Sequence, residues 1–288
     1  MKPFTYLTPS DPYEAVRLLD EYGPGARIIA GGQTLLLAMK DRSERPPVLV
    51  SLAGISDLSA VGTDVSGQLV VGATTTYAAL THAAFSGWHR EISAMAGNLA
   101  DRPVRTMGTI GGALCSGDPR YDMPTLVIGV GAQLETLSPS GVRTLAPEEF
   151  FGADGAATIA SNEILASIRF PSANAFTAVV FEKFRQRTFD AALVSALCAT
   201  RLDGDGAVAE LRITVGAATP VPTRAVESAR GLIGRPAADI DPAAVAVAVS
   251  DEVLGESGAD SDLVQYQREL IKALTRKALS RALTTSRS

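Results

Sequence analysis

Two pairs of adjacent glycines are the residues of this chain with the clearest chemical use. The first pair lies in the stretch Arg27-Ile28-Ile29-Ala30-Gly31-Gly32-Gln33-Thr34-Leu35-Leu36-Leu37. This stretch begins as a β-branched run typical of a buried strand and continues as a Leu-rich segment that can open a helix with Thr34 as its N-cap. A strand that breaks at glycines before a helix points several backbone N–H groups into one small space. Such a space suits an anion, and the glycines let a phosphate approach the backbone.

The second glycine pair follows farther along the chain. Met107-Gly108-Thr109-Ile110-Gly111-Gly112-Ala113-Leu114 leads into Cys115-Ser116-Gly117-Asp118-Pro119, and we expect another loop rich in N–H donors there. Neither pair has the G-x-G-x-x-G or the G-x-x-x-x-G-K-[ST] spacing, so the Rossmann and P-loop interpretations lose their main support. One Gly-Gly pair is typical of a simple turn. Two pairs in one domain, with an Asp-Pro turn after the second, predict a shared pyrophosphate site.

Other reactive residues are few, and their scarcity excludes several functions. Cys115 and Cys198 are too few for a disulfide framework or a four-thiolate iron–sulfur or zinc site, and His82 and His89 are the only histidines. A formal net charge of −5 without a basic block argues against nucleic acid as the main partner. We find no signal-peptide apolar region and no apolar run of about 18 residues, so we expect a cytoplasmic chain without a transmembrane segment.

The elements that position the first glycine pair form a small unit at the start of the chain. The 288 residues are enough for one to three domains. Residues 1–57 have the pattern of a β-α-β-α-β unit, in which the first helix begins after a cap at Ser10 or Asp11. The expected strands are residues 4–7, 27–30 and 48–52, and the expected helices are residues 12–22 and 35–39.

The remainder of the chain predicts a mixture of helices and strands in two further parts. In residues 58–172 we expect paired strands at 58–62 and 68–73, helices at 77–84 and 91–100, a hairpin of 132–137 and 142–145, and a strand at 163–170; residues 124–130 are apolar throughout and fit a helix or a strand. In residues 173–288 we expect a three-stranded antiparallel sheet of 179–184, 192–201 and 207–215, then helices at 225–232, 242–253 and 263–283. The last helix has an apolar side that we expect to pack on this sheet.

Both glycine segments resemble motifs of one known family. Ala30-Gly31-Gly32-Gln33-Thr34-Leu35-Leu36 resembles the A-G-G-x-S-L-L segment of the FAD-binding medium subunits of molybdenum hydroxylases, the family of xanthine dehydrogenase and carbon monoxide dehydrogenase. Thr109-Ile110-Gly111-Gly112-Ala113-Leu114, followed by Asp118-Pro119 and Asp122-x-Pro124, resembles its T-I-G-G-N-L…D-P-x-x-D-x-P run. Thr219–Ala225 and Tyr266-Gln267-Arg268 resemble its C-terminal domain. The resemblance covers nearly the whole chain.

The resemblance implies a fold and an FAD site. The implied α+β fold is a two-lobed FAD-binding domain of the vanillyl-alcohol-oxidase (PCMH) type, residues 1–57 and 58–172, followed by a C-terminal domain, residues 173–288, of antiparallel sheet and helices. In the family the FAD diphosphate lies between the two glycine segments. The residues implied for this cradle are Ile29, Ala30, Gly31, Gly32, Gln33, Thr34, Leu35, Thr109, Ile110, Gly111, Gly112 and Ala113, with Ser116 and Asp118 beside them.

Further residues are carried over one by one. Asp122 matches an aspartate on the adenosine side, Leu165 a residue that borders the flavin, and Lys183 a lysine near the isoalloxazine ring, where an ammonium stabilises negative charge on reduced flavin. The chain departs from the family at three places, since Gln33-Thr34 replaces His-Ser, Ala113 replaces an asparagine, and Ala191 replaces a tyrosine that shields the flavin. Phe189 is the candidate substitute for that tyrosine.

The function implied by the resemblance is electron transfer. The chain would carry FAD, and two partner subunits would carry the other cofactors: a large subunit with molybdopterin, and a small subunit with two [2Fe–2S] clusters. The implied assembly is a dimer of heterotrimers. No residue is assigned as acid, base or nucleophile, and no metal ligand is expected here. Substitution of Gly32 or Gly111 by Glu is expected to remove FAD without unfolding the chain. Two alternatives remain, a self-contained FAD-dependent oxidoreductase and a flavin-free assembly or scaffold protein.

Overall fold

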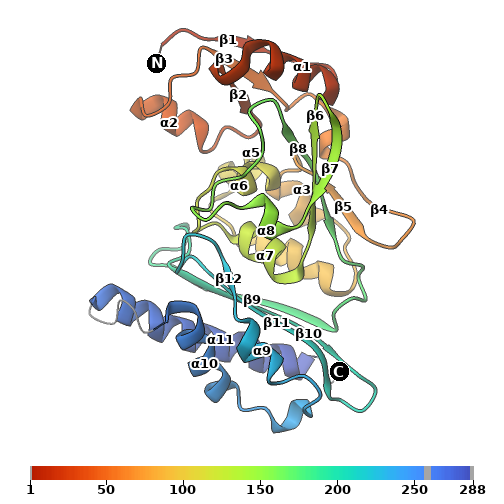
Figure 1. Ribbon diagram of the computed structural model, residues 1–288, viewed down its shortest axis with the longest axis vertical. Coiled ribbons are helices and arrows are strands. Elements are labelled where there is room, and N and C mark those ends of the chain that lie inside the picture. The colour runs from red at the N-terminus through yellow and green to blue at the C-terminus, as the bar shows by residue number, and fades with distance from the viewer. Residues whose placement is uncertain (1, 256–260, 286–288) are drawn as a thin grey trace.

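Three β-sheets follow one another along the long axis of the molecule (Figure 1). The structure is a computed structural model and describes residues 2–255 and 261–285. Within these residues the first sheet is parallel and the other two are antiparallel, so the α+β class expected from the sequence is confirmed. No described helix is long and apolar enough to cross a membrane.

The N-terminal part is the β-α-β-α-β unit that the sequence predicts. Its parallel sheet has the strand order β1-β3-β2. Helix α1 begins where the Asp11 side chain accepts a hydrogen bond from the Glu14 amide at 2.8 Å, and Ala15, Val16 and Leu19 bury one side of the helix. The elements are β1 (Thr5–Leu7), α1 (Pro12–Tyr22), η1 (Gly23–Gly25), β2 (Ala26–Ile29), α2 (Leu35–Asp41) and β3 (Val48–Ser51).

The middle part contains a five-stranded antiparallel sheet with the order β4-β5-β8-β6-β7. Its apolar segment at residues 124–130, which fitted a helix or a strand, belongs to helix α7. Every residue of α7 is buried, and a helix that is apolar on all sides carries no periodicity that the sequence could reveal. The elements are η2 (Ser56–Ser59), β4 (Val61–Thr63), β5 (Leu69–Gly72), α3 (Tyr77–His82), η3 (Gly87–His89), α4 (Arg90–Gly97), α5 (Arg102–Met107), α6 (Ile110–Cys115), α7 (Asp122–Val130), β6 (Gln133–Ser138), β7 (Gly141–Leu145), α8 (Pro147–Phe150) and β8 (Ile164–Phe170).

The C-terminal part contains a sheet of four strands in the order β12-β11-β10-β9, so the expected number of three is wrong. The additional strand β12 has two residues, Thr223 and Arg224, and follows Pro220 and Pro222, so it leaves no alternating pattern in the sequence. The elements are β9 (Ala178–Phe184), β10 (Val194–Leu202), β11 (Val208–Gly216), β12 (Thr223–Arg224), α9 (Val226–Arg230), η4 (Ala237–Asp239), α10 (Pro242–Leu254) and α11 (Asp262–Thr285).

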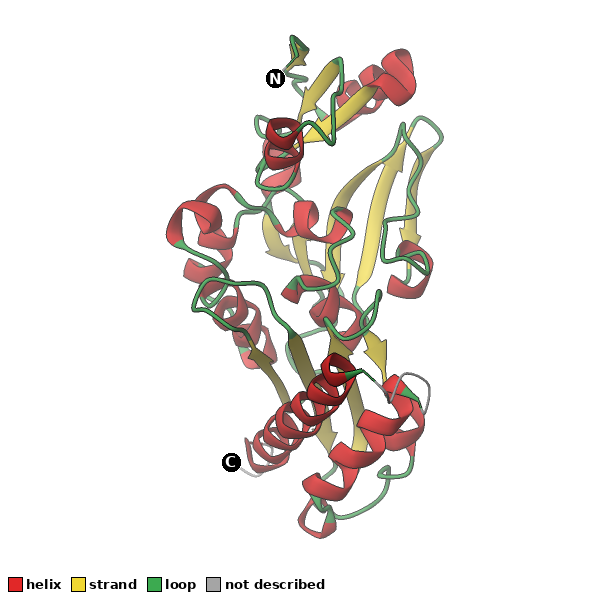
Figure 2. Ribbon diagram, turned by 90° about the vertical axis from the view of Figure 1, so that its left-hand side faces the viewer, coloured by secondary structure: helices red, strands yellow, loops and turns green. Residues whose placement is uncertain are grey.

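This sheet separates two packing layers. Helices α10 and α11 cover one of its faces, and the buried helix α7 contacts the other through β10 and β11 (Figures 1 and 2). The prediction that the last helix packs on the sheet is confirmed, because Ala278 and Leu283 are buried in the same apolar cluster as the strands. Alternation along β9 gives its residues different partners. Glu182 forms ion pairs with Lys277 and Arg281 of α11, whereas the next residue, Lys183, faces the middle part.

Candidate functional site

A cavity of about 780 Å³ lies between the three parts of the molecule, and all of them contribute to its walls. This volume lies in the range of ligand-binding pockets, roughly 300–1,000 Å³. The N-terminal part contributes Ile29 to Leu35, the middle part contributes residues such as Tyr77 and Leu165, and the C-terminal part contributes Lys183 and Phe189 to Ala191. The walls are mainly apolar, so the polar groups that face the cavity stand out.

The first glycine segment meets the second at the cavity wall. Gly32 has a φ of +68°, a conformation that residues with a side chain rarely adopt. Gly31 is pressed against the other segment, because a Cβ atom at this position would lie 2.0 Å from the carbonyl oxygen of Met107. The structure therefore confirms that the two glycine segments lie side by side.

Six consecutive amides make the first segment a candidate anion site. Within the described chain, none of the backbone N–H groups of residues 30–35 donates to a protein acceptor, and all six residues line the cavity. The turn itself is closed from the other direction, since the carbonyl oxygens of Gly32 and Thr34 accept bonds from Leu36 and Ala38 at 3.1 Å. Unpaired N–H groups gathered along one turn attract an anion strongly. This arrangement agrees with the predicted phosphate cradle.

The predicted cap at Thr34 is wrong. Thr34 has helical backbone angles, φ −103° and ψ −52°, and its side chain makes no capping hydrogen bond to α2. An N-cap needs an extended backbone for its oxygen to reach the first turn. The Thr34 hydroxyl lies instead 3.3 Å from the hydroxyl of Tyr121, which connects the N-terminal part to the middle part.

The second glycine segment is not the donor-rich loop that the sequence suggested. It is the first turn of α6, where the Thr109 hydroxyl accepts a hydrogen bond from the Gly112 amide at 3.1 Å. The amide of Ile110 donates to Thr75, that of Gly111 to Ala73, and that of Ala113 to Thr109. These donors are already used within the protein, so the free amides at this cavity come mainly from the first segment.

Gly111 also has a different purpose from the predicted one. A Cβ atom there would lie 2.6 Å from both the Cβ atom and the carbonyl oxygen of Ala73, so glycine is needed for α6 to pack on the end of β5. The expectation that Gly111→Glu removes FAD from a folded chain is therefore wrong, because this change disrupts packing first. Gly112 meets only the Thr109 hydroxyl, at 2.9 Å, and it does line the cavity.

The structure brings most of the predicted site residues to this cavity and leaves two outside it. The predicted residues that line the cavity are Ile29, Ala30, Gly31, Gly32, Gln33, Thr34, Leu35, Thr109, Gly111, Gly112, Ala113, Ser116, Asp122, Leu165 and Lys183. The side chain of Ile110 is fully buried in the core instead. Asp118 accepts hydrogen bonds from Arg120 at 2.9 and 2.7 Å, and these bonds hold the pKa of Asp118 below its usual value. Asp118 therefore orients Arg120, which lines the cavity itself.

A buried ion pair joins α7 to β9 at the cavity. The Nζ atom of Lys183 lies 2.5 Å from Oδ2 of Asp122, and the two side chains are 6% and 4% exposed. Burial raises the pKa of the Asp122 carboxyl, and the Lys183 ammonium opposes that rise. Asp122 was expected at the adenosine and Lys183 at the isoalloxazine ring. These two placements are incompatible for an extended FAD, since the side chains share one hydrogen bond.

Sequence reasoning missed several residues that line the cavity. They are Thr74, Tyr77, Arg120, Tyr121 and Ile159. Burial and the nearby Asp122 raise the pKa of Tyr77, so its hydroxyl stays neutral. A signal was present only for Arg120 and Tyr121, which stand between the two aspartates of the recognised run. The others come from segments that approach the cavity only after folding.

The donor set of the cavity suits a dinucleotide and no metal ion. In residues 2–255 and 261–285 no cluster of three or more His, Cys, Asp or Glu side chains is placed to hold a metal. The cavity offers instead a row of free amides and long apolar walls, which match a diphosphate and flat aromatic rings. The residues present therefore fit FAD.

Comparison with known proteins identifies relatives over the full chain. Residues 2–173 match the family model of the FAD binding domain in molybdopterin dehydrogenase, and residues 179–282 match that of the CO dehydrogenase flavoprotein C-terminal domain. The carbon monoxide dehydrogenase medium chain of Afipia carboxidovorans is 33% identical, over 97% of this chain and 96% of that protein. The caffeine dehydrogenase subunit beta of a Pseudomonas species is 29% identical, over 98% and 96%. The crystal structure of quinoline 2-oxidoreductase from Pseudomonas putida 86 covers both chains fully, with a TM-score of 0.89 and 27% identity.

Proposed function

Because this chain belongs to the family of FAD-binding medium subunits of molybdenum hydroxylases, we propose that it transfers electrons within such a complex. It would receive them from the [2Fe–2S] clusters of a partner subunit and pass them to an external acceptor. The observation that supports this proposal best is the row of free amides at residues 30–35, which faces a cavity of about 780 Å³. Bound FAD supplies the redox chemistry, because it exchanges electrons singly or in pairs.

The work of this chain's own residues is binding and electrostatic adjustment. The amides of residues 30–35 would hold the FAD diphosphate, and the walls around Leu165 and Ile159 would exclude water from the rings. Lys183 keeps a positive charge next to the cavity, and Asp122 fixes its position. A fixed ammonium stabilises negative charge that develops nearby. We assign none of these residues as acid, base or nucleophile.

The proposed partners are a large subunit with the molybdopterin cofactor and a small iron–sulfur subunit, assembled as a dimer of heterotrimers. Relatives named for different substrates, carbon monoxide and caffeine, have similar medium subunits. We therefore propose that a partner subunit determines the substrate. We also propose the domain boundaries 1–57, 58–172 and 173–288, and a cytoplasmic location, which suits the free thiols of Cys115 and Cys198.

Reduction of the isolated chain tests this function against a self-contained oxidoreductase. The chain loaded with FAD is mixed with candidate organic substrates, with and without the copurified partner subunits, and flavin absorbance is followed. We expect bleaching only when the partners are present. Bleaching by an organic substrate without partners would contradict the proposal and favour an independent enzyme, and a chain that takes up no FAD would support the scaffold alternative.

A further inference from the structure

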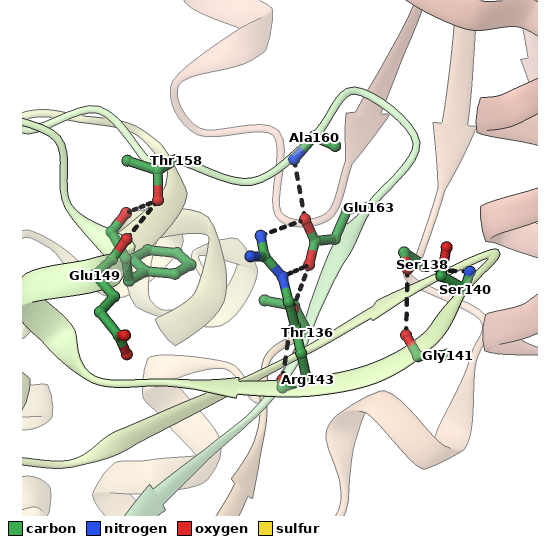
Figure 3. Close-up of polar contacts among 10 residues, drawn as sticks. Thr136, Ser138, Ser140, Gly141, Arg143, Glu149, Thr158, Ala160 and Glu163 are labelled. Carbon is green, nitrogen blue, oxygen red and sulfur yellow. Dashed lines mark hydrogen bonds and ion pairs between the residues drawn. The ribbon is translucent and has the colours of Figure 1, made fainter.

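A buried carboxylate beside the cavity has no part in the function proposed above. The Glu163 side chain is only 2% exposed. It accepts hydrogen bonds from Nε and Nη2 of Arg143 at 2.7 and 2.8 Å, from the Ala160 amide at 3.0 Å, and from the Thr136 hydroxyl (Figure 3). Burial of a charge is costly unless hydrogen bonds compensate it. Its partners come from β6, β7 and the loop before β8, so one carboxylate ties three segments together.

This carboxylate stands next to an irregularity in the middle sheet. Along the β6–β8 pair, Glu135 faces Ser167, but the next residue of β6, Thr136, faces Leu165. One residue of β8, Ala166, is therefore extra at this point, which makes a β-bulge. A bulge bends its strand and changes the direction of the side chains beside it. The redirected side chain here is Leu165, which lines the cavity.

The loop before β8 presents a second wall residue between two anchors. Ile159 lines the cavity, and its neighbours on both sides are held. On one side, the Thr158 amide donates to the carbonyl oxygen of Phe150 at 2.8 Å, and its hydroxyl donates to that of Glu149 at 2.6 Å (Figure 3). On the other side, the Ala160 amide is bound to the buried carboxylate. Loss of that carboxylate would release one of the two anchors.

We propose that Glu163 is a positioning residue for FAD, an inference that rests on the proposed function. By fixing the bulge and the loop together, its carboxylate sets the directions in which Leu165 and Ile159 face the cavity. Without this shared acceptor the Thr136 hydroxyl and the Ala160 amide lose their partner, and the strand register at the bulge is less strongly specified. The wall then fits the flat rings of FAD less closely, although the strands themselves remain paired.

The titration of Glu163 sets the pH range of this effect. Burial raises the carboxyl pKa, but the bonds from Arg143, Thr136 and Ala160 outweigh it and hold the pKa of Glu163 below its usual value. A lowered folded-state pKa gives stability that is present above the unfolded value of about 4.3 and is lost as the pH falls through the folded value. The anchor is therefore intact at neutral pH, where FAD binding is measured.

Glu135 provides a matched control on the same sheet. Its carboxylate accepts hydrogen bonds from Ser167 and Arg169 at 2.6 and 2.7 Å, and it does not line the cavity. We expect Glu163→Ala to raise the dissociation constant of FAD about tenfold, the scale on which supporting residues act, and to alter the visible circular dichroism of bound FAD. We expect Glu135→Ala to leave both within about twofold, although it too removes a network that stabilises the sheet.

Three outcomes would overturn the inference. They are a Glu163→Ala chain with unchanged FAD affinity and spectrum, a Glu135→Ala chain as impaired as Glu163→Ala, and a wild-type chain that binds no FAD, which also refutes the proposed function. If Glu163→Ala does not fold, Thr136→Val decides, because it keeps the branched shape and removes one donor. An increase in the dissociation constant of about threefold or more, with an altered spectrum, supports the inference, and an unchanged value and spectrum overturn it.

Discussion

The ion pair between Asp122 and Lys183 allows a quantitative prediction. In Lys183→Met the apolar stem of the side chain remains while the ammonium is lost, so a carboxylate that is 4% exposed is left unpaired. At an effective dielectric constant of about 20, the Coulomb attraction at 2.5 Å is about 7 kcal/mol before desolvation is counted. Removal of one partner of a buried pair usually costs about 3–5 kcal/mol, and we expect a loss of this size in the free energy of unfolding.

The assay is urea unfolding of the FAD-free chain, with a matched substitution as control. Lys272→Met also breaks an ion pair, with Glu269 at 2.8 Å, but Glu269 is 70% exposed, so the expected loss is below about 1 kcal/mol. Addition of Asp122→Asn to Lys183→Met removes the unpaired charge, and we expect it to recover about 1–3 kcal/mol. A Lys183→Met chain within about 1 kcal/mol of wild type would refute the reasoning.

The pH dependence of the Lys183→Met chain provides a second criterion. Burial already raises the pKa of Asp122, and loss of the ammonium raises it further. A carboxyl whose folded-state pKa is raised binds its proton more tightly in the folded chain, so its stability contribution is present below the unfolded value of about 3.9 and is lost as the pH rises. The deficit relative to wild type should therefore be larger at pH 8 than at pH 5. An equal deficit at both pH values would show that the carboxylate is not the cause.

Three further substitutions test other parts of the site. Gly31→Ala places a Cβ atom 2.0 Å from the Met107 carbonyl oxygen, so we expect loss of FAD binding and a lower Tm, whereas Gly112→Ala meets only the Thr109 hydroxyl and should stay folded; thermal melts and flavin fluorescence compare them. Phe189→Ala removes a side chain that is 63% exposed, so the free energy of unfolding should change by less than about 0.5 kcal/mol while FAD fluorescence in the complex increases; unchanged fluorescence would show that Phe189 does not cover the flavin. Thr34→Val removes no capping bond, so urea unfolding should reveal a loss below about 0.5 kcal/mol, and a loss near 1 kcal/mol would restore the cap.

The fold was largely predictable because most elements carry local signals. The Asp11-Pro12 start of α1, the β-branched strands and the Asp203-Gly204-Asp205-Gly206 turn before β11 all have their expected places. Helix α7 and strand β12 were not predictable. The first has apolar residues on every side, and the second has only two residues. Local pattern fails in both cases because tertiary packing determines the conformation.

The site was predictable where backbone geometry alone creates it. The turn at Gly31-Gly32 follows from residue types, and it gives the free amides that the sequence suggested. The second glycine pair misled, because glycine there serves close packing on Ala73, which only the fold reveals. The contact between Asp122 and Lys183 joins residues 61 positions apart, and it exists because α7 packs on the C-terminal sheet.

A crystal structure of this chain loaded with FAD tests the central claim most directly. The account predicts that the diphosphate oxygens lie within hydrogen-bonding distance of the backbone N–H groups of residues 30–35, which have no acceptor in the described protein. A diphosphate bound elsewhere in the cavity, with those amides facing solvent, would contradict it.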